Sequence, residues 1–462
     1  MSKFHFLDWG IILTYFIGLI WIGIIHQKDQ STSQNDFILS GRRLSLAGFV
    51  ATLVTTWYGA ILGIGENTFL YGIQTWFIFS LPYYLFAIGY AFWIAPKIRE
   101  KGLLSIPDHF RSHYGEAPGI ISAILVTFLA SPAPYILSMG ILLQFLFEIE
   151  LGLALMISTL FSIVYIWNGG VSAVVKTDFF QFIFMFLGFI LLLGFLWAGL
   201  DSPIAMIRAL PSKFIDPLGG NTTQYLLVWF FIAAWTFIDP GFFQRCAAAD
   251  SPETAKKGIL IAICFWAVFD CLTILSGLYA IGHLQSSQAL LSYPLLAADI
   301  LPIGIFGLFI TGILATIMST IDSLSLISAI TFGRDILWRI QRPKTDSNPV
   351  PLIKKGLVII SFISMFLAFS LPSVVKLFYT LGSVLIPGLI LPFIVTLWKS
   401  EKSIPDGFAI QWILVPVFVS LFWFGLSQIG QNPFLNIEPF YPGMGISILY
   451  YLAMNKRIKH GN

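Results

Sequence analysis

Apolar stretches of about 20 residues, the length of a membrane-spanning helix, recur along the whole chain and restrict its fold more than any other feature. The 462 residues are 57% hydrophobic and only 11% charged, whereas soluble domains carry about 25% charged residues. The mean hydropathy is +0.84. We therefore expect an all-α integral membrane protein in which residues 1–462 form a single transmembrane domain embedded in a lipid bilayer.

About thirteen spanning helices are expected. They lie near residues 7–25, 47–70, 75–96, 118–147, 151–167, 177–199, 224–244, 258–282, 300–332, 352–371, 375–398, 408–427 and 439–455. The first is interpreted as a retained helix and not as a signal peptide, because Asp8 precedes it and no small-residue cleavage site follows.

The basic residues indicate the orientation of these helices. With the N-terminus outside, the inside segments hold all but four of the 26 Lys and Arg residues. The four outside are Lys3, Arg208, Lys213 and Lys376. This positive-inside asymmetry predicts an outside N-terminus and a cytoplasmic C-terminus in a plasma membrane, the cytoplasmic membrane of a bacterium. The net charge of +3 reflects topology, so nucleic acid is not an expected partner.

Several acidic residues fall inside or at the edges of the spans: Glu66, Asp178, Asp239, Asp270 and Asp322. An ionisable group at the bilayer centre costs ~2.5 to 3.5 kcal/mol, so each is a candidate functional residue. Acids without basic partners at similar depth suggest that cations bind. For Glu66 and Asp270 the alternative is a position at the membrane interface or a protonated side chain.

The segment ATIMSTIDSLS, residues 315–325, places hydroxyl groups in an apolar span. At about 100° per residue, the side chains of Thr316, Ser319, Thr320 and Ser323 share an arc of about 100° on one helix face, and Asp322 flanks it. Such oxygens are ligands for a hard cation that has lost its water. The alternative is that these hydroxyls bond their own i−4 carbonyls or a neighbouring helix.

Two spans carry residues that interrupt helices. The second span combines glycines with polar and aromatic residues in TTWYGAILGIG, and the seventh contains Asp239, Pro240 and Gly241. Glycines also permit close helix packing, which is the alternative. Two discontinuous helices five positions apart are typical of transporters built from an inverted five-helix repeat.

Six sequence segments, roughly between Phe37 and Arg334, carry a family resemblance. In chain order they are DFILSGRRLS, TFLYG, IPDHFRSHYG, NGGVSAVVKTDFFQ, FFQRCAAAD and LATIMSTIDSLSLISAITFGRDI. In this order the chain resembles the sodium:solute symporters, which have a leucine-transporter-like (LeuT-type) fold. The resemblance implies an extra N-terminal helix at 7–25, a ten-helix core at 47–398 and two C-terminal helices at 408–455.

The resemblance also implies ion sites, with Na⁺ as the coupling ion. The main site would use the backbone carbonyls of Leu53, Thr56 and Thr316 and the hydroxyls of Ser319 and Thr320. A second sodium site would use Asp178 and Ser323, joined or tuned by Asp322.

The solute would lie beside the main sodium site. The residues implied are Thr55, Trp57, Tyr58, Gly59, Ser131, Tyr135, Trp235, Phe237 and Asp239. Thr55 stands where the proline carriers have an aspartate, and the Gln/Glu cluster of the sugar carriers is missing from this helix. Neither proline nor galactose is therefore favoured.

These observations predict a sodium-coupled symporter that imports a small polar organic solute by alternating access and works as a monomer. One alternative is a proton-coupled carrier that uses Asp178 or Asp322. Another is a transporter-like solute sensor, disfavoured because no output domain follows before Asn462. An enzyme is not expected, since the sequence has no Gly-rich phosphate loop, no HExxH and no GxSxG motif.

Overall fold

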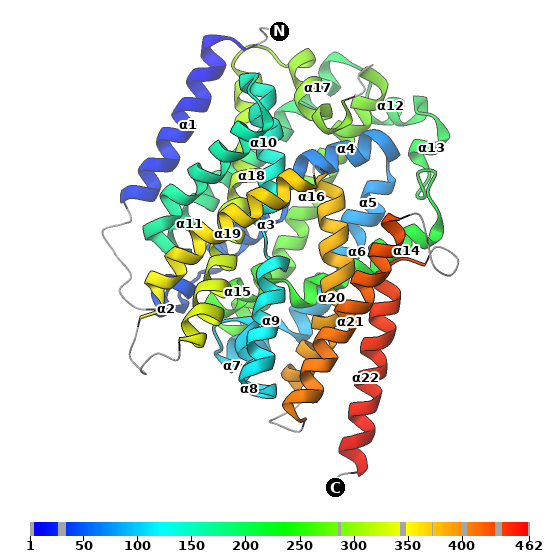
Figure 1. Ribbon diagram of the computed structural model, residues 1–462. Coiled ribbons are helices and arrows are strands. Elements are labelled where there is room, and N and C mark those ends of the chain that lie inside the picture. Colours follow the sequence, from blue (N-terminus) through cyan, green and yellow to red (C-terminus); the bar gives the residue numbers. More distant parts are fainter. Residues whose placement is uncertain are drawn as a thin grey trace.

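The computed structural model describes residues 4–25, 34–284, 288–341, 348–371, 373–398, 404–429 and 437–460. This part of the chain is helical apart from loops and one isolated β-bridge. The helices run mostly along one direction, and the two termini lie at opposite ends of the bundle (Figure 1). Opposite ends are what an odd number of crossings requires.

The helices that form the bundle are α1 (Phe6–Ile25), α3 (Leu46–Trp57), α4 (Ile61–Tyr71), α5 (Gln74–Phe79), α6 (Leu81–Trp93), α9 (Glu116–Leu129), α10 (Ala133–Phe147), α11 (Leu151–Gly199), α14 (Thr223–Ile232), α15 (Pro240–Ala248), α16 (Pro252–His283), α18 (Ile305–Ile330), α19 (Val350–Ser370), α20 (Val374–Trp398), α21 (Asp406–Gln428) and α22 (Phe440–His460). Shorter helices connect them: α2 (Gln34–Leu39), η2 (Ser40–Arg42), α7 (Ala95–Lys101), α8 (Ile106–Tyr114), α12 (Pro203–Ala209), α13 (Ser212–Ile215), η3 (Ala233–Ile238), η4 (Ala289–Leu291), α17 (Ser292–Ile300) and the π-helix η5 (Thr331–Trp338).

Nine helices among the described residues are long and apolar enough to cross a membrane, and the bent pair α3 and α4 makes a tenth span. The predicted spans at 7–25, 151–167 and 439–455 correspond to α1, the first part of α11 and α22. The count of thirteen stays a prediction.

The second predicted span is broken where its glycines begin. Helix α3 ends at Trp57, α4 begins at Ile61, and their axes differ by 53°. Gly59 lies in the break, where a Cβ atom would come within 2.4 Å of both Thr320 on α18 and Tyr135 on α10. Only glycine lets three helices meet here.

The seventh predicted span is also interrupted. The 3₁₀ helix η3 ends at Ile238, Asp239 is extended with φ −67° and ψ 121°, and α15 starts at Pro240. The Asp239 carboxylate caps α15 by accepting the Phe242 N–H at 2.8 Å. Both predicted discontinuities are therefore present.

Two predicted boundaries differ from the structure. The single span expected at 118–147 is divided into α9 and α10 at Ala130–Pro132. The separate spans expected at 151–167 and 177–199 are instead joined as one helix, α11, which is non-helical only at Gly170. Gly170 has φ +55°, and a Cβ there would lie 2.5 Å from the Phe37 carbonyl oxygen, so α11 bends where it meets α2.

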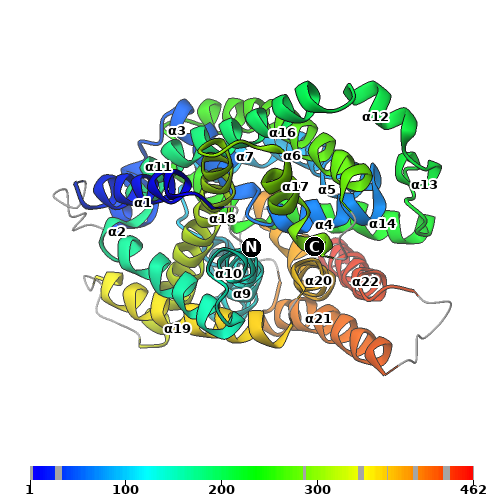
Figure 2. The same cartoon turned by 90° about the horizontal axis from the view of Figure 1, so that it is seen from above.

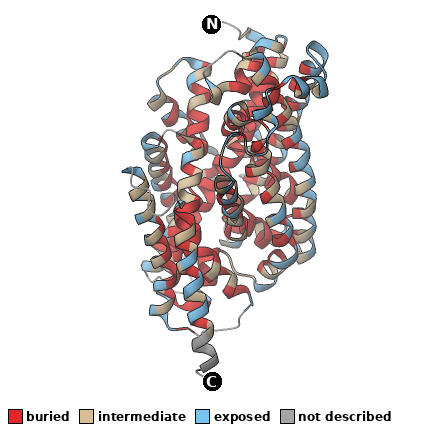
Figure 3. Ribbon diagram, turned by 90° about the vertical axis from the view of Figure 1, so that its right-hand side faces the viewer, coloured by how far each residue is buried: buried red, intermediate tan, exposed pale blue. Residues whose placement is uncertain are grey.

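Helix α18 lies inside the bundle. In the span Ile305–Trp338, 89% of an 18-residue apolar stretch is buried, whereas the corresponding share in Asp406–Gln428 is 33%. Viewed from above, α1 and α22 lie at opposite sides of the molecule (Figure 2). Buried residues fill the interior, and exposed ones lie mainly on the outer surface (Figure 3). The large exposed side chains include Phe366, Trp197 and Phe422, as expected for a surface that faces lipid.

The two broken helices are tied together at one end by backbone hydrogen bonds. Leu44 N–H donates to the Ala248 carbonyl at 3.0 Å, and Asp250 N–H donates to the Leu44 carbonyl at 3.1 Å. The resulting parallel bridge between Leu44 and Ala249 joins the start of α3 to the end of α15.

An ion-pair network joins α8 to η5 and to Arg339 just after it, on the predicted inside. Asp108 contacts Arg111 at 2.7 Å and Arg334 at 2.8 Å, and Arg339 lies 3.7 Å away. Burial alone would raise the pKa of the Asp108 carboxyl, but these guanidinium groups outweigh it and hold that pKa below its usual range. Arg334, counted above with the inside loops, is only 3% exposed. It belongs to the buried end of this span, where Asp108 and Asp335 compensate its charge.

Candidate ion and solute site

The Thr320 hydroxyl lies at the break between α3 and α4. Its oxygen is 2.9 Å from the Thr56 carbonyl oxygen, 3.4 Å from that of Thr55 and 3.3 Å from that of Thr316. The last carbonyls of a helix have no partner within it, so those of Thr55 and Thr56 are available to other groups. Three residues predicted for the main sodium site, Thr56, Thr316 and Thr320, thus meet at one point.

Two other residues predicted for the main site lie beside it. Ser319 donates its hydroxyl proton to the Asp178 carboxylate at 2.6 Å, which leaves its two oxygen lone pairs for a cation. Leu53 lies one turn before Thr56 on α3. The Thr316 hydroxyl bonds the i−4 carbonyl of Gly312 at 2.7 Å, so only the Thr316 carbonyl faces the site.

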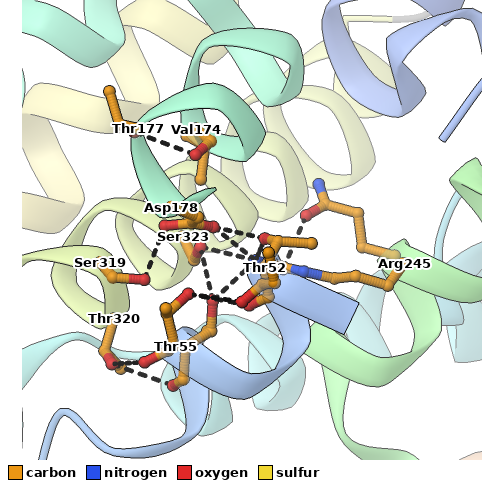
Figure 4. Close-up of polar contacts among 12 residues, drawn as sticks. Thr52, Thr55, Val174, Thr177, Asp178, Arg245, Ser319, Thr320 and Ser323 are labelled. Carbon is orange, nitrogen blue, oxygen red and sulfur yellow. Dashed lines mark hydrogen bonds and ion pairs between the residues drawn. The ribbon is translucent and has the colours of Figure 1, made fainter. Parts of the chain in front are cut away.

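Arg245 on α15 lies among the oxygens predicted for the second sodium site. Its guanidinium is 2.6 Å from the Ser323 hydroxyl, 2.9 Å from that of Thr56 and 3.0 Å from that of Thr52. The Asp178 carboxylate is 3.9 Å away and also accepts the Thr52 hydroxyl proton. Figure 4 shows this convergence from four helices. A buried positive charge of the protein itself therefore occupies the second-site oxygens in this conformation.

This position corrects the assignment of Arg245 to an inside loop. The residue is 4% exposed and lies within the span Thr223–Ala248. Because α15 is the second half of a broken helix, its side chains reach the centre of the bundle. Asp322 is buried on α18, close enough to Tyr15 of α1 for their side chains to interact electrostatically.

A cavity lies between the two helix breaks, with about 1070 Å³ of empty space including its mouth. Five residues predicted for the solute site line it: Trp57, Tyr58, Tyr135, Trp235 and Asp239. The other four do not. Thr55 bonds the Ala51 carbonyl at 3.0 Å, Gly59 is enclosed by Thr320 and Tyr135, Ser131 bonds Ser364 at 2.9 Å, and Phe237 packs against Phe86.

Sequence reasoning missed further residues of the cavity wall. They include Phe79, Tyr83, Trp229, Phe242, Arg245 and Phe378. Aromatic residues make up 16% of the chain, so nothing local distinguishes the aromatic members of this wall from lipid-facing ones. Asp270, noted as a charge within a span, also lines the cavity and accepts the hydroxyl protons of Tyr58 at 2.8 Å and of Tyr84.

The model of the sodium:solute symporter family matches residues 37–402. The chain is 24% identical over 453 residues to a sodium/glucose cotransporter of Vibrio parahaemolyticus, covering 86% of this chain and 82% of that one. It is 22% identical over 475 residues to the high-affinity choline transporter 1 of Drosophila melanogaster, covering 94% and 72%.

Solved structures agree on the fold. A Na⁺-coupled sialic acid symporter in a substrate-bound outward-open state superposes with a TM-score of 0.81 at 18% identity, over 98% of each chain. The inward-facing conformation of Mhp1 gives 0.54 at 14% identity, over 89% of this chain and 91% of that one.

The helical bundle, its two broken helices and the cavity between them define a secondary transporter of leucine-transporter-like fold. The chain belongs to the sodium:solute symporter family. It is a transporter and not an enzyme, and sodium is the ion that drives its import of solute. Family membership favours sodium coupling over the proton-coupled and sensor alternatives.

Proposed function

We propose that the coupling sodium ion binds where α3 breaks against α18. Its ligands are the carbonyls of Leu53, Thr56 and Thr316 and the hydroxyls of Ser319 and Thr320. The observation that supports this site most is the 2.9 Å approach of the Thr320 hydroxyl to the Thr56 carbonyl at the helix end. An all-oxygen ligand set suits a hard cation that has lost its water.

A second sodium ion would compete with Arg245 for the oxygens of Asp178 and Ser323. With the guanidinium in place, the charge of Asp178 is already balanced, so one sodium ion per solute drives transport. The buried Asp322 tunes this region through its charge. A second ion enters only if Arg245 withdraws.

The ion acts by thermodynamic linkage. Sodium binds the outward-open state more tightly because it joins α3 to α18, and the completed site then favours solute binding in the adjacent cavity. The solute is a small organic molecule, as the names of the glucose and choline relatives support. Each monomer performs this cycle in the cytoplasmic membrane of a bacterium, with the N-terminus outside.

Uptake into liposomes tests the proposal. Purified protein should accumulate solute only with an inward sodium gradient, whereas potassium with an inward proton gradient should give no accumulation. Thr320→Ala liposomes serve as the site-specific control and should need more sodium. Full uptake without sodium would contradict the proposal.

A further inference from the structure

The cavity between the helix breaks has two aromatic walls. On one side, Trp57 packs edge-to-face against Tyr83 with ring centres 4.9 Å apart. On the other, Phe378 packs edge-to-face against Tyr135 at 5.4 Å and Trp235 at 6.4 Å. The two rings of an edge-to-face pair point in different directions, so the aromatic rings that line the cavity are not all parallel.

The charged groups of the same cavity are unbalanced. Asp239 and Asp270 both line it, and neither forms an ion pair within the described part of the chain. Arg245 is the basic residue of the lining, and its guanidinium is held by Asp178 and three hydroxyls. The cavity therefore presents excess negative charge beside aromatic rings, in a membrane interior where uncompensated charge is costly.

One hydrogen-bond donor also remains in the wall. The indole N–H of Trp235 has no partner among the described residues. Buried donors are normally paired, so a solute that fills the cavity is expected to bring an acceptor oxygen.

These three features fit one chemical class. A fully alkylated ammonium group has no N–H donors to satisfy, carries positive charge and binds the faces of aromatic rings. A sugar needs many polar partners, which these aromatic walls do not offer. An amino acid would bring its carboxylate next to Asp239 and Asp270, while the guanidinium of Arg245 is already engaged.

Building on the sodium-coupled uptake proposed above, we propose that the solute is a small organic cation with a quaternary ammonium group and a nearby hydroxyl or carbonyl oxygen. The ammonium lies among Trp57, Tyr83, Tyr135 and Phe378. Asp239 and Asp270 balance its charge, and the indole N–H of Trp235 donates to its oxygen.

Binding of matched probes tests this substrate class. Choline and its neutral isostere 3,3-dimethylbutan-1-ol would be titrated into the full-length protein in sodium chloride, with heat or tryptophan fluorescence as the readout. Choline should bind about tenfold or more tightly than the neutral alcohol, because only choline carries the cation. Equal affinities, or tighter binding of glucose or proline, would overturn the proposal.

Variants locate the site. Trp57→Leu should weaken choline binding about tenfold, and Trp57→Phe should restore part of it. Trp235→Phe should weaken binding of choline but not of tetramethylammonium, which has no oxygen. Trp197→Leu is the matched control, because Trp197 is 61% exposed on the outer surface of α11. Each variant must retain its sodium-dependent thermal shift, so that loss of folding is not mistaken for loss of binding. A Trp57→Leu protein with wild-type choline affinity would refute the aromatic site.

The outcomes also separate this inference from the proposed function. Sodium-driven uptake of glucose or proline, without choline binding, would sustain the coupling proposal and refute the substrate class. Choline binding that does not depend on sodium would support the substrate class and refute the coupling proposal.

Discussion

Thr320 and Thr316 carry the same side chain one turn apart on α18, but only the Thr320 hydroxyl reaches α3. Thr320→Ala should weaken sodium binding by ~1.5 to 3 kcal/mol, taking hydrogen bonds to charged groups as a proxy. Thr316→Ala should leave sodium affinity unchanged, since its hydroxyl bonds Gly312 and its carbonyl remains. Sodium-dependent thermal shifts measure both. Equal losses in the two variants would count against the site.

Gly59 permits the contact between the helix break, α10 and α18. Gly59→Ala should abolish sodium-driven uptake, because the new methyl group would lie 2.4 Å from atoms of Thr320 and Tyr135. Gly194→Ala is the control, since a Cβ there, on α11, meets nothing within 4 Å. Active Gly59→Ala protein would show that the break is not this closely packed during transport.

Arg245 sets the number of sodium ions in our proposal. The wild-type protein should show a sodium Hill coefficient near one, and Arg245→Gln should raise it, because the freed Asp178 and Ser323 can then bind a second ion. The double variant Arg245→Gln, Asp178→Asn should return to one. A wild-type coefficient of two, unchanged in Arg245→Gln, would show that the guanidinium and the ion do not compete.

The hydroxyls of α18 were predictable individually because helix geometry alone places Thr316, Ser319, Thr320 and Ser323 on one face. The hydrogen-bond partner that each hydroxyl takes was not predictable. Whether a hydroxyl turns to its own helix or to a neighbour depends on the tertiary partner, here Asp178 for Ser319. Arg245 escaped detection because counting loop charges assigns every arginine near a span end to water.

At the level of elements, α8 contains a buried histidine whose charge state depends on the fold. Burial, with Lys101 adding to it, lowers the pKa of His109 from 6.5 to about 3. The unfolded chain therefore binds a proton near pH 6.5 that the folded protein does not, so stability falls as pH drops below this value. Between about pH 7.5 and pH 5 the loss should be about 2 kcal/mol.

His109→Phe should remove this acid sensitivity, since His109 packs edge-on against Phe243 and Phe393, and an aromatic ring preserves those contacts. Thermal unfolding at about pH 7.5 and pH 5 measures this acid sensitivity. His283→Phe is the control, because His283 is exposed at the end of α16. An identical pH response of wild type and His109→Phe would contradict the assignment.

Some of the helix breaks could be predicted from the sequence and others could not. Those near Gly59 and Asp239 were predicted, since polar residues, glycine and proline coincide within apolar spans. The break at Pro132 was missed because prolines also occur in the first turn of helices, as Pro134 does in α10. The bend at Gly170 depends on the Phe37 carbonyl, a contact far away in sequence.

For the whole molecule, the topology can be tested by labelling. With the native cysteines replaced, Asp201→Cys should react with a membrane-impermeant maleimide in intact cells, because it is an exposed residue before α12 on the predicted outside. Lys257→Cys, exposed near the start of α16, should react only after the cells are opened. The reverse labelling pattern would show that the chain has the opposite orientation in the membrane.

The fold class was predictable from apolar spans and from motif order, since both persist at low identity. The shape of the cavity was not. It is built from α3, α4, α5, α6, α10, α14, η3, α15, α16, α18 and α20, whose lining residues are scattered from Leu53 to Phe378. Only packing decides which aromatic residues turn inward and which face lipid.

The backbone bridge between Leu44 and Ala249 makes one mechanical part of two half-helices. Helix α3 carries the carbonyls of the proposed sodium site, and α15 carries Arg245 and, at its cap, Asp239 of the cavity. A displacement of one half-helix is therefore expected to move the other, because main-chain hydrogen bonds join them, and only a substitution by proline would remove their N–H donors. The proposed sodium site and the solute cavity thus share one rigid unit, formed by α3 and α15. Movement of this unit when the ion leaves would also displace residues of the solute cavity.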